Sequence, residues 1–118
     1  MTEQSHGAAR DIADVPAIEI ISTAALHLMS ASAIACGLAE PEPDGSGGAT
    51  LRDLDQARAL INALAALVTA AAPDLGPLHA APLRDGVKAL QQAFREASEF
   101  PDAPGEGPGE RWTHPGRR

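Results

Sequence analysis

Apolar residues cover nearly every side of the stretch from residue 15 to residue 38, in which Glu19 is the single formal charge. Asp14, followed by Val15 and Pro16, predicts the start of a helix, because aspartate can cap the free N–H groups of a first turn and proline needs no partner there. We therefore predict a helix over residues 15–38. A helix that is apolar on most of its sides needs more covering surface than one small chain supplies.

One face of this helix is the candidate oligomer interface. Placed at about 100° per residue, seven residues share that face, namely Ile18, Ile21, Ala25, Leu28, Met29, Ser32 and Cys36. A domain of this size buries only about 60% of the surface that its unfolded chain exposes. Cys36 is the only cysteine, so no intrachain disulfide can add stability, and self-association is the remaining way to bury more surface. The pattern predicts a homo-oligomer.

A second predicted helix spans residues 50–72. It follows a stretch of glycine, proline and acidic residues at 39–49, which we interpret as a flexible linker. Thr50 with Asp53 three residues later resembles a capping box, which is typical of a helix start. Behind it, leucine, isoleucine, valine and alanine fall on one broad stripe, with polar residues on the opposite side.

A third predicted helix spans residues 77–99, after a tight reversal. Pro77 and Pro82 both suit a first turn, so either can mark its start. Gly86 falls on the apolar stripe of this helix, which favours the close approach of another backbone. Alternating runs of β-branched residues, which are typical of strands, do not occur in the sequence.

These elements define an all-α, three-helix domain at residues 15–99, built as a helical hairpin plus an apolar N-terminal helix. Residues 1–14 have no hydrophobic period, and residues 100–118 are rich in proline and glycine. We predict that both ends are disordered.

Charge and composition restrict the function further. Sixteen acidic against nine basic residues give a net charge of −7, which repels a phosphate backbone, and aromatic residues make up only 3%. Direct binding to nucleic acid is therefore not expected. No cysteines and histidines have metal-ligand spacing, and we predict no metal, no cofactor and no catalytic residues. The prediction is a cytoplasmic interaction or scaffold module that is not an enzyme.

A membrane-attached protein is one alternative. The predicted first helix is about 36 Å long, enough to cross a bilayer core. Glu19 within it and acidic rather than basic flanks oppose insertion. The segment around Cys36 resembles a lipoprotein cleavage site, but the acidic residues before it do not suit a secretory signal. We interpret Cys36 as a small buried apolar residue and expect no membrane binding.

A small enzyme with a pocket between subunits is the other alternative. Glu19, His27 and Ser30 would have to line that pocket. The sequence supplies no visible oxyanion hole or acidic residue to orient the histidine. We interpret His27 as a residue at a contact between helices.

Arg111 and Trp112 form a candidate motif for a protein partner. A tryptophan in a proline- and glycine-rich tail has no predicted core to enter, and tryptophan is frequent among residues that anchor interfaces. An idle tail is the simpler interpretation.

Four segments resemble the bacterial family known as domain of unknown function 1844: residues 16–29, 53–58, 69–75 and 80–86, together with Ile61, Leu64 and Leu67. Residues 101–110 are similar to the tail of one branch of that family. The family has no established activity, so the resemblance implies no catalytic residue. Some members have genes beside those of ribosomal proteins and a translation initiation factor, and the resemblance therefore implies a role linked to translation.

Overall fold

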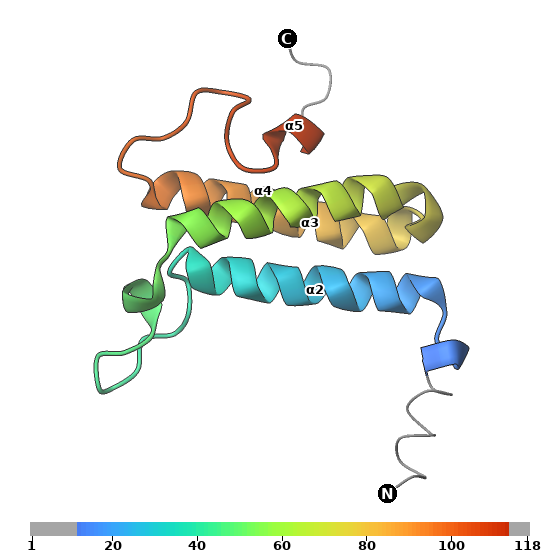
Figure 1. The fold of residues 1–118 in the computed structure, drawn as a ribbon, viewed down its shortest axis with the longest axis horizontal. Coiled ribbons are helices and arrows are strands. Elements are labelled where there is room, and N and C mark those ends of the chain that lie inside the picture. Colours follow the sequence, from blue (N-terminus) through green and yellow to red (C-terminus); the bar gives the residue numbers. More distant parts are fainter. Residues whose placement is uncertain (1–11, 114–118) are drawn as a thin grey trace, which may run out of the picture.

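The computed structural model describes residues 12–113. Its elements are α2 (Ala17–Ala35), the 3₁₀ helix η1 (Gly48–Leu51), α3 (Leu54–Leu75), α4 (Pro77–Ala97) and the short α5 (Glu110–Thr113) (Figure 1). The described residues contain no strand, and their single β-bridge joins Pro41 to Gly47. The predicted all-α fold with three long helices is confirmed.

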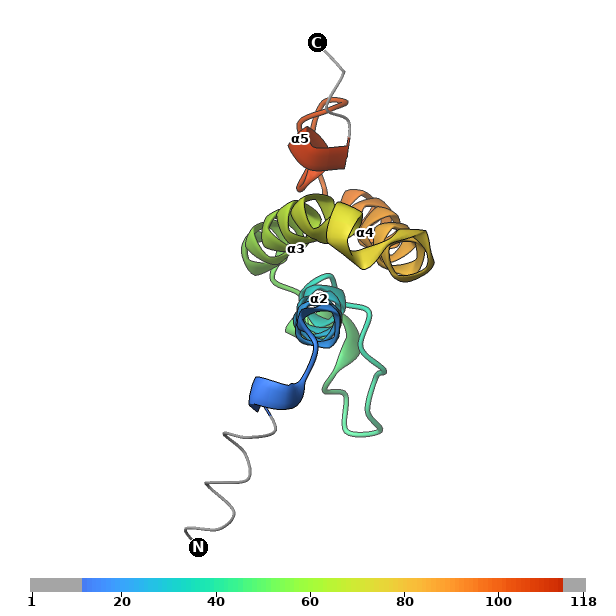
Figure 2. The same cartoon turned by 90° about the vertical axis from the view of Figure 1, so that its right-hand side faces the viewer.

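The three long helices form two layers. α3 and α4 lie side by side as a hairpin, and α2 packs across one face of it, mainly against α3 (Figures 1 and 2). Residues 101–113, which we name the strap, lie on the opposite face of the hairpin and end in α5. The hairpin is therefore covered on both of its faces.

The core lies between α2 and the hairpin. The largest fully buried apolar side chains of the described residues belong to the hairpin, namely Ile61, Leu64 and Val68 of α3 and Val87 of α4. Ser32 of α2 is also fully buried, and its hydroxyl donates a hydrogen bond to the Leu28 carbonyl at 2.7 Å, which satisfies the polar group inside the core.

The helix predicted over residues 15–38 is shorter at its start. Pro16 has extended backbone angles (φ −60°, ψ 147°), so α2 begins at Ala17. No side chain caps this end, and the predicted capping role of Asp14 is wrong. Asp14 belongs instead to a separate helical turn at residues 12–14.

The same helix ends three residues earlier than predicted, at Ala35. The Gly37 N–H donates to the Ile34 carbonyl at 2.9 Å, and the Leu38 N–H donates to the Ala33 carbonyl at 3.0 Å. This pair of bonds is a Schellman motif, and it requires the positive φ of 88° at Gly37, which glycine adopts at little cost.

The linker predicted as flexible is a hydrogen-bonded turn. The Glu42 N–H donates to the Ser46 carbonyl at 2.7 Å. Asp44 Oδ1 accepts from the Ser46 hydroxyl at 2.6 Å and from its N–H at 2.9 Å. The hydroxyl bond is the largest cause that lowers the pKa of the Asp44 carboxyl. Glycine and proline permit the backbone angles of this turn, and the hydrogen bonds among its own residues stabilise it.

Asp53, rather than Thr50, caps the second long helix. Its Oδ1 accepts the Gln56 N–H at 3.2 Å, and its own N–H donates to the Ala35 carbonyl at 2.8 Å. Asp53 therefore joins the start of α3 to the end of α2. Thr50 lies in η1, where its hydroxyl donates to the Gly47 carbonyl.

The hairpin has a one-residue connection. α3 continues through Pro73 to Leu75, beyond its predicted end at 72, and Gly76 alone separates it from α4. Of the two predicted starts of the third helix, Pro77 is the one observed, and Pro82 lies inside α4.

Gly86 lies where two helices approach closely, as predicted, but its neighbour is a side chain. A Cβ atom added at Gly86 would clash with the terminal methyl group of Met29 from α2. The absent side chain of Gly86 therefore makes room for Met29, and not for another backbone.

The predicted disorder of the C-terminal tail is wrong for the strap. Pro108 and Gly109 are buried, and polar side chains of α3 and α4 bind the strap. The remaining parts of the two predicted disordered ends, residues 1–11 and 114–118, lie outside the described residues.

Candidate interaction surfaces

The seven residues predicted as an oligomer interface pack within the chain. Ala25, Ser32 and Cys36 are buried. The other four are partly buried against the same core, namely Ile18, Ile21, Leu28 and Met29. The pattern identified the most apolar face of α2 correctly, but α3 and α4 of the same chain cover that face. The interface role assigned to these residues is corrected accordingly.

The opposite side of α2 carries a second stripe, apolar except for His27, which we name the outer stripe. Its members recur at steps of three and four residues, namely Ala17, Ile20, Ala24, His27, Ala31 and Ile34. All are exposed except Ala31, which is half-buried. Ile20 is 48% exposed and Ile34 46%. Two leucines outside the stripe are also exposed, namely Leu26 on another side of α2 at 54% and Leu38 after its end at 59%. Packing on the hairpin therefore leaves much of the apolar surface of α2 uncovered.

The three residues of the enzyme alternative lie on α2 outside the core. Glu19, His27 and Ser30 are all exposed. A pocket that included them would need walls from another molecule.

Cys36 is a buried thiol at the C-cap of α2. It is 2% exposed, and burial raises the pKa of the thiol from its ordinary 9.0, opposed in part by the positive charge of Arg52. The thiolate, which is the reactive form, is therefore disfavoured at neutral pH. This environment agrees with Cys36 as a small apolar residue and disagrees with its use as a lipid anchor.

An ion pair holds the first part of the strap. Arg58 Nη2 of α3 contacts both carboxylate oxygens of Asp102, at 3.0 and 3.1 Å. The Arg58 guanidinium also lies over the Phe94 ring of α4, 5.0 Å from its centroid. Arg95 donates to the Asp102 carbonyl at 3.3 Å. Asp102 thus contacts both helices of the hairpin.

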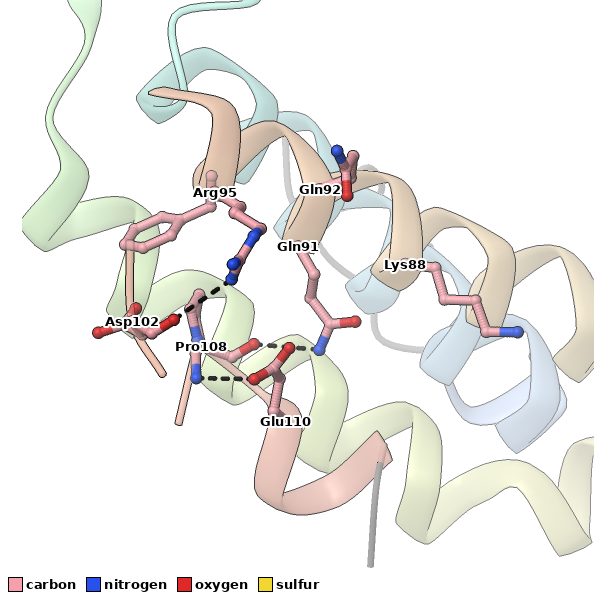
Figure 3. A pocket seen from close by; sticks show the side chains of 9 residues that line it. Lys88, Gln91, Gln92, Arg95, Asp102, Pro108 and Glu110 are labelled. Atoms are coloured by element: carbon pink, nitrogen blue, oxygen red, sulfur yellow. Dashed lines mark hydrogen bonds between the residues drawn. The ribbon is translucent and has the colours of Figure 1, made fainter. Parts of the chain in front are cut away.

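Two amides hold the second part of the strap. Asn62 Oδ1 of α3 accepts the Gly109 N–H at 2.6 Å, and Gln91 Nε2 of α4 donates to the Pro108 carbonyl at 3.0 Å. Glu110 folds back to accept the Gly107 N–H at 2.8 Å. Figure 3 shows Gln91 and Arg95 of α4 pointing toward the strap, near Glu110 of the strap. These residues line a cavity of about 220 Å³. These polar side chains bind the strap itself.

Arg111 and Trp112, the candidate partner motif, lie at the end of the strap. The Arg111 guanidinium is 5.2 Å from the centroid of the Trp112 ring. Trp112 is 37% exposed and borders a groove of about 370 Å³ between α3, α4 and the strap. Trp112 is therefore partly packed on its own chain and partly exposed to solvent.

Within residues 12–113, no group of histidine, cysteine, aspartate and glutamate could hold a metal ion. Two of the described helices, α2 and α3, are long and apolar enough to cross a membrane by length and composition. Only 11% of the most apolar window of α2 is buried, against 39% of that of α3.

These features define a small all-α protein whose helical hairpin is packed between one apolar helix and a C-terminal strap. The profile of the family described as Domain of unknown function (DUF1844) matches residues 17–96, which contain all three long helices. The chain belongs to this family, and the resemblance noted from the sequence is confirmed. The strap lies beyond the matched residues. No curated protein and no solved structure matches the chain.

Proposed function

We propose that the protein is a non-catalytic interaction module of the cytoplasm that forms a homodimer through the outer stripe of α2. The observation that carries this proposal is the exposure of Ile20 and Ile34 on a helix that is already packed on its other side. Each half-exposed isoleucine has roughly 1 kcal/mol still to gain from full burial. In a two-fold dimer each of these residues occurs on both copies, so the free energy gained by its burial is contributed twice.

The order of residues along the outer stripe favours a second copy of this chain as the partner. Large and small side chains alternate along it, from Ala17 to Ile34. If a second α2 lies antiparallel so that paired residue numbers sum to about 51, Ile20 meets Ala31 and Ile34 meets Ala17 of the other copy. His27 meets Ala24 in the same way. Large residues then pack into the spaces above alanines along the whole stripe.

Charge argues against a membrane as the cover of the outer stripe. Asp14 precedes α2, and Glu40, Glu42 and Asp44 follow it, so both ends are acidic. Anionic lipid headgroups repel these carboxylates.

Charge-inserting substitutions test the dimer. Ile20→Glu and Ile34→Glu should each convert a dimer to a monomer by light scattering behind gel filtration, because a carboxylate would be desolvated in the seam. The matched control is Leu78→Glu, which lies on α4 outside the outer stripe and is 89% exposed, and this variant should remain dimeric. Equal behaviour of all three variants contradicts the proposal. Flotation of the intact chain with phosphatidylglycerol-containing vesicles would also overturn it in favour of the membrane.

Cysteine pairing tests the direction of the helices, in a Cys36→Ala background. A mixture of Ala17→Cys and Ile34→Cys chains should form a disulfide-linked heterodimer under mild oxidation. Ala17→Cys alone should not crosslink. In an antiparallel pair each residue 17 faces residue 34 of the other copy, so the two cysteines lie at opposite ends of the interface, about 25 Å of helix apart. Efficient crosslinking of Ala17→Cys alone would demonstrate a parallel pair.

A role linked to translation and a protein partner for Arg111 and Trp112 remain predictions. Pull-down from cells with the intact chain and with Trp112→Ala tests both. The prediction is that ribosomal or initiation proteins bind the intact chain, with weaker recovery by the variant. Identical partner lists would remove Trp112 from that role.

A further inference from the structure

The groove beside Trp112 has an apolar floor and a cationic side. Ala65 and Val68 of α3 and Val87 of α4 form the floor, and all three are buried. Arg84 and Lys88 lie one turn apart on α4 and line the same groove. Trp112 of the strap borders it from above the hairpin. Three different elements therefore contribute to one site.

Neither cation at the groove has a carboxylate partner within the part of the chain that the structure describes. The ion pair of the described residues joins Arg58 to Asp102, on another part of the hairpin. Figure 3 shows Lys88 extending along α4, away from the bond between Gln91 and Pro108 and from the bond of Glu110 within the strap. In a chain of net charge −7, two cations without an ion-pair partner on one side of an apolar groove produce a local positive potential that attracts an anion.

We propose that this groove binds a small organic carboxylate with an apolar body. The Arg84 guanidinium would bind the carboxylate through two parallel N–H bonds, and Lys88 would add a second positive charge. The apolar body would lie between the Trp112 ring and the alanine and valine floor. The proposal is independent of the dimer, because the outer stripe lies on the other layer of the molecule.

The size of the groove restricts the ligand. Its volume of about 370 Å³ is at the lower end of the range for small-molecule sites, about 300–1,000 Å³. At about 30 Å³ for each water-sized group, a ligand of about twelve non-hydrogen atoms fills it. An eight-carbon carboxylate such as octanoate, with ten non-hydrogen atoms, fits within this volume and has this chemistry.

The single tryptophan of the chain reports directly on the site. Trp112 is the only tryptophan and the chain contains no tyrosine. The fluorescence emission of the protein therefore reports the environment of Trp112 at the groove, without a contribution from another tryptophan or a tyrosine. Octanoate should give a saturable blue shift of Trp112 emission. Octan-1-ol at the same concentration, which has the apolar body but no charge, should give a much smaller response, and so should inorganic phosphate.

Substitutions on α4 then test the cations. Arg84→Gln and Lys88→Gln should each raise the dissociation constant for octanoate about tenfold, because each removes a positive charge that attracts the carboxylate, and Arg84→Gln also removes the paired N–H bonds. Arg52→Gln makes the same charge change at the C-cap of η1 and should leave binding unchanged. Ile34→Glu on the outer stripe should also leave it unchanged.

Several results would overturn the proposal. These are the absence of a saturable response at millimolar octanoate, an equal response to octan-1-ol, and an equal affinity for inorganic phosphate. Undiminished binding by both α4 variants, or loss of binding in Arg52→Gln, would do the same. If Trp112 responds to a partner protein and not to octanoate, the groove is a protein-binding surface.

Discussion

Gly109 of the strap donates its N–H to Asn62 Oδ1 of α3 at 2.6 Å, although 47 positions separate the two residues in the sequence. Gly109 also has a positive φ of 74°, and a Cβ atom added there would lie 2.8 Å from the Cβ of Ala65. The strap can therefore reach the hairpin at this point only because residue 109 has no side chain.

Gly109→Ala should release the second part of the strap. The added methyl group would clash with the Ala65 Cβ of α3, which is fixed directly to the helix backbone and cannot rotate away. Moving the strap to relieve this clash would break the hydrogen bond between Gly109 and Asn62. We expect a red shift of Trp112 emission with little change in helix content by circular dichroism. Gly105→Ala is the matched control, because Gly105 has a similar φ of 86° but open space around it. An equal effect of the two substitutions would show that backbone angle alone, without packing on Ala65, accounts for the result.

Asp53→Ala should destabilise the protein by about 1 kcal/mol, because the substitution removes the side-chain cap of α3. Urea unfolding followed by circular dichroism measures this change. Asp55→Ala removes the same charge from the first turn without touching the cap and should cost less than about 0.5 kcal/mol. Equal losses for both variants would assign the effect to charge and not to capping.

Met29 and Gly86 should behave as a coupled pair. Gly86→Ala gains about 1 kcal/mol in helix propensity but forces the Met29 methyl group to move. In a Met29→Ala background the clash is absent, so Gly86→Ala should stabilise the protein by about 1 kcal/mol. A double-mutant cycle from urea unfolding measures the coupling. Additive effects of the two substitutions would contradict the contact between α2 and α4.

Stability should fall at alkaline pH through Cys36. Burial raises the pKa of this thiol in the folded state, so the folded state holds the proton more tightly than the unfolded state. The stability that the neutral, buried thiol contributes is fully present below its ordinary pKa of 9.0. It is lost as the pH rises from there through the higher pKa of the folded state. Cys36→Ala should show a smaller loss of stability over that range. The absence of tyrosine removes one competing alkaline titration. Identical pH profiles for the two proteins would contradict the burial of the thiol.

Hydrophobic periodicity predicted the three long helices well because each carries a continuous apolar stripe. It placed their ends less well, since those depend on single residues such as Gly37 and Asp53, whose hydrogen-bond partners a stripe does not reveal. The fate of the apolar face of α2 was misassigned for another reason. Periodicity identifies a face that must be buried, but it does not identify the molecule that buries it.

The strap was missed because its composition is typical of disorder and its stability comes from elsewhere in the chain. Asn62 and Gln91 look like ordinary polar residues of helical surfaces, and only the fold brings them to Gly109 and Pro108. The buried Gly109 contributes by having no side chain, which hydrophobic pattern analysis does not score. A glutamate three residues after Gly107, which caps that glycine's N–H, was the local signal of order.

Sedimentation equilibrium of the intact chain, from about 1 µM to about 1 mM, is the most direct measurement of whether a second copy covers α2. We predict a reversible association to twice the 12.1 kDa of one chain, which Ile34→Glu abolishes and Leu78→Glu leaves unchanged. A mass of 12.1 kDa for the intact chain at every concentration would contradict the account.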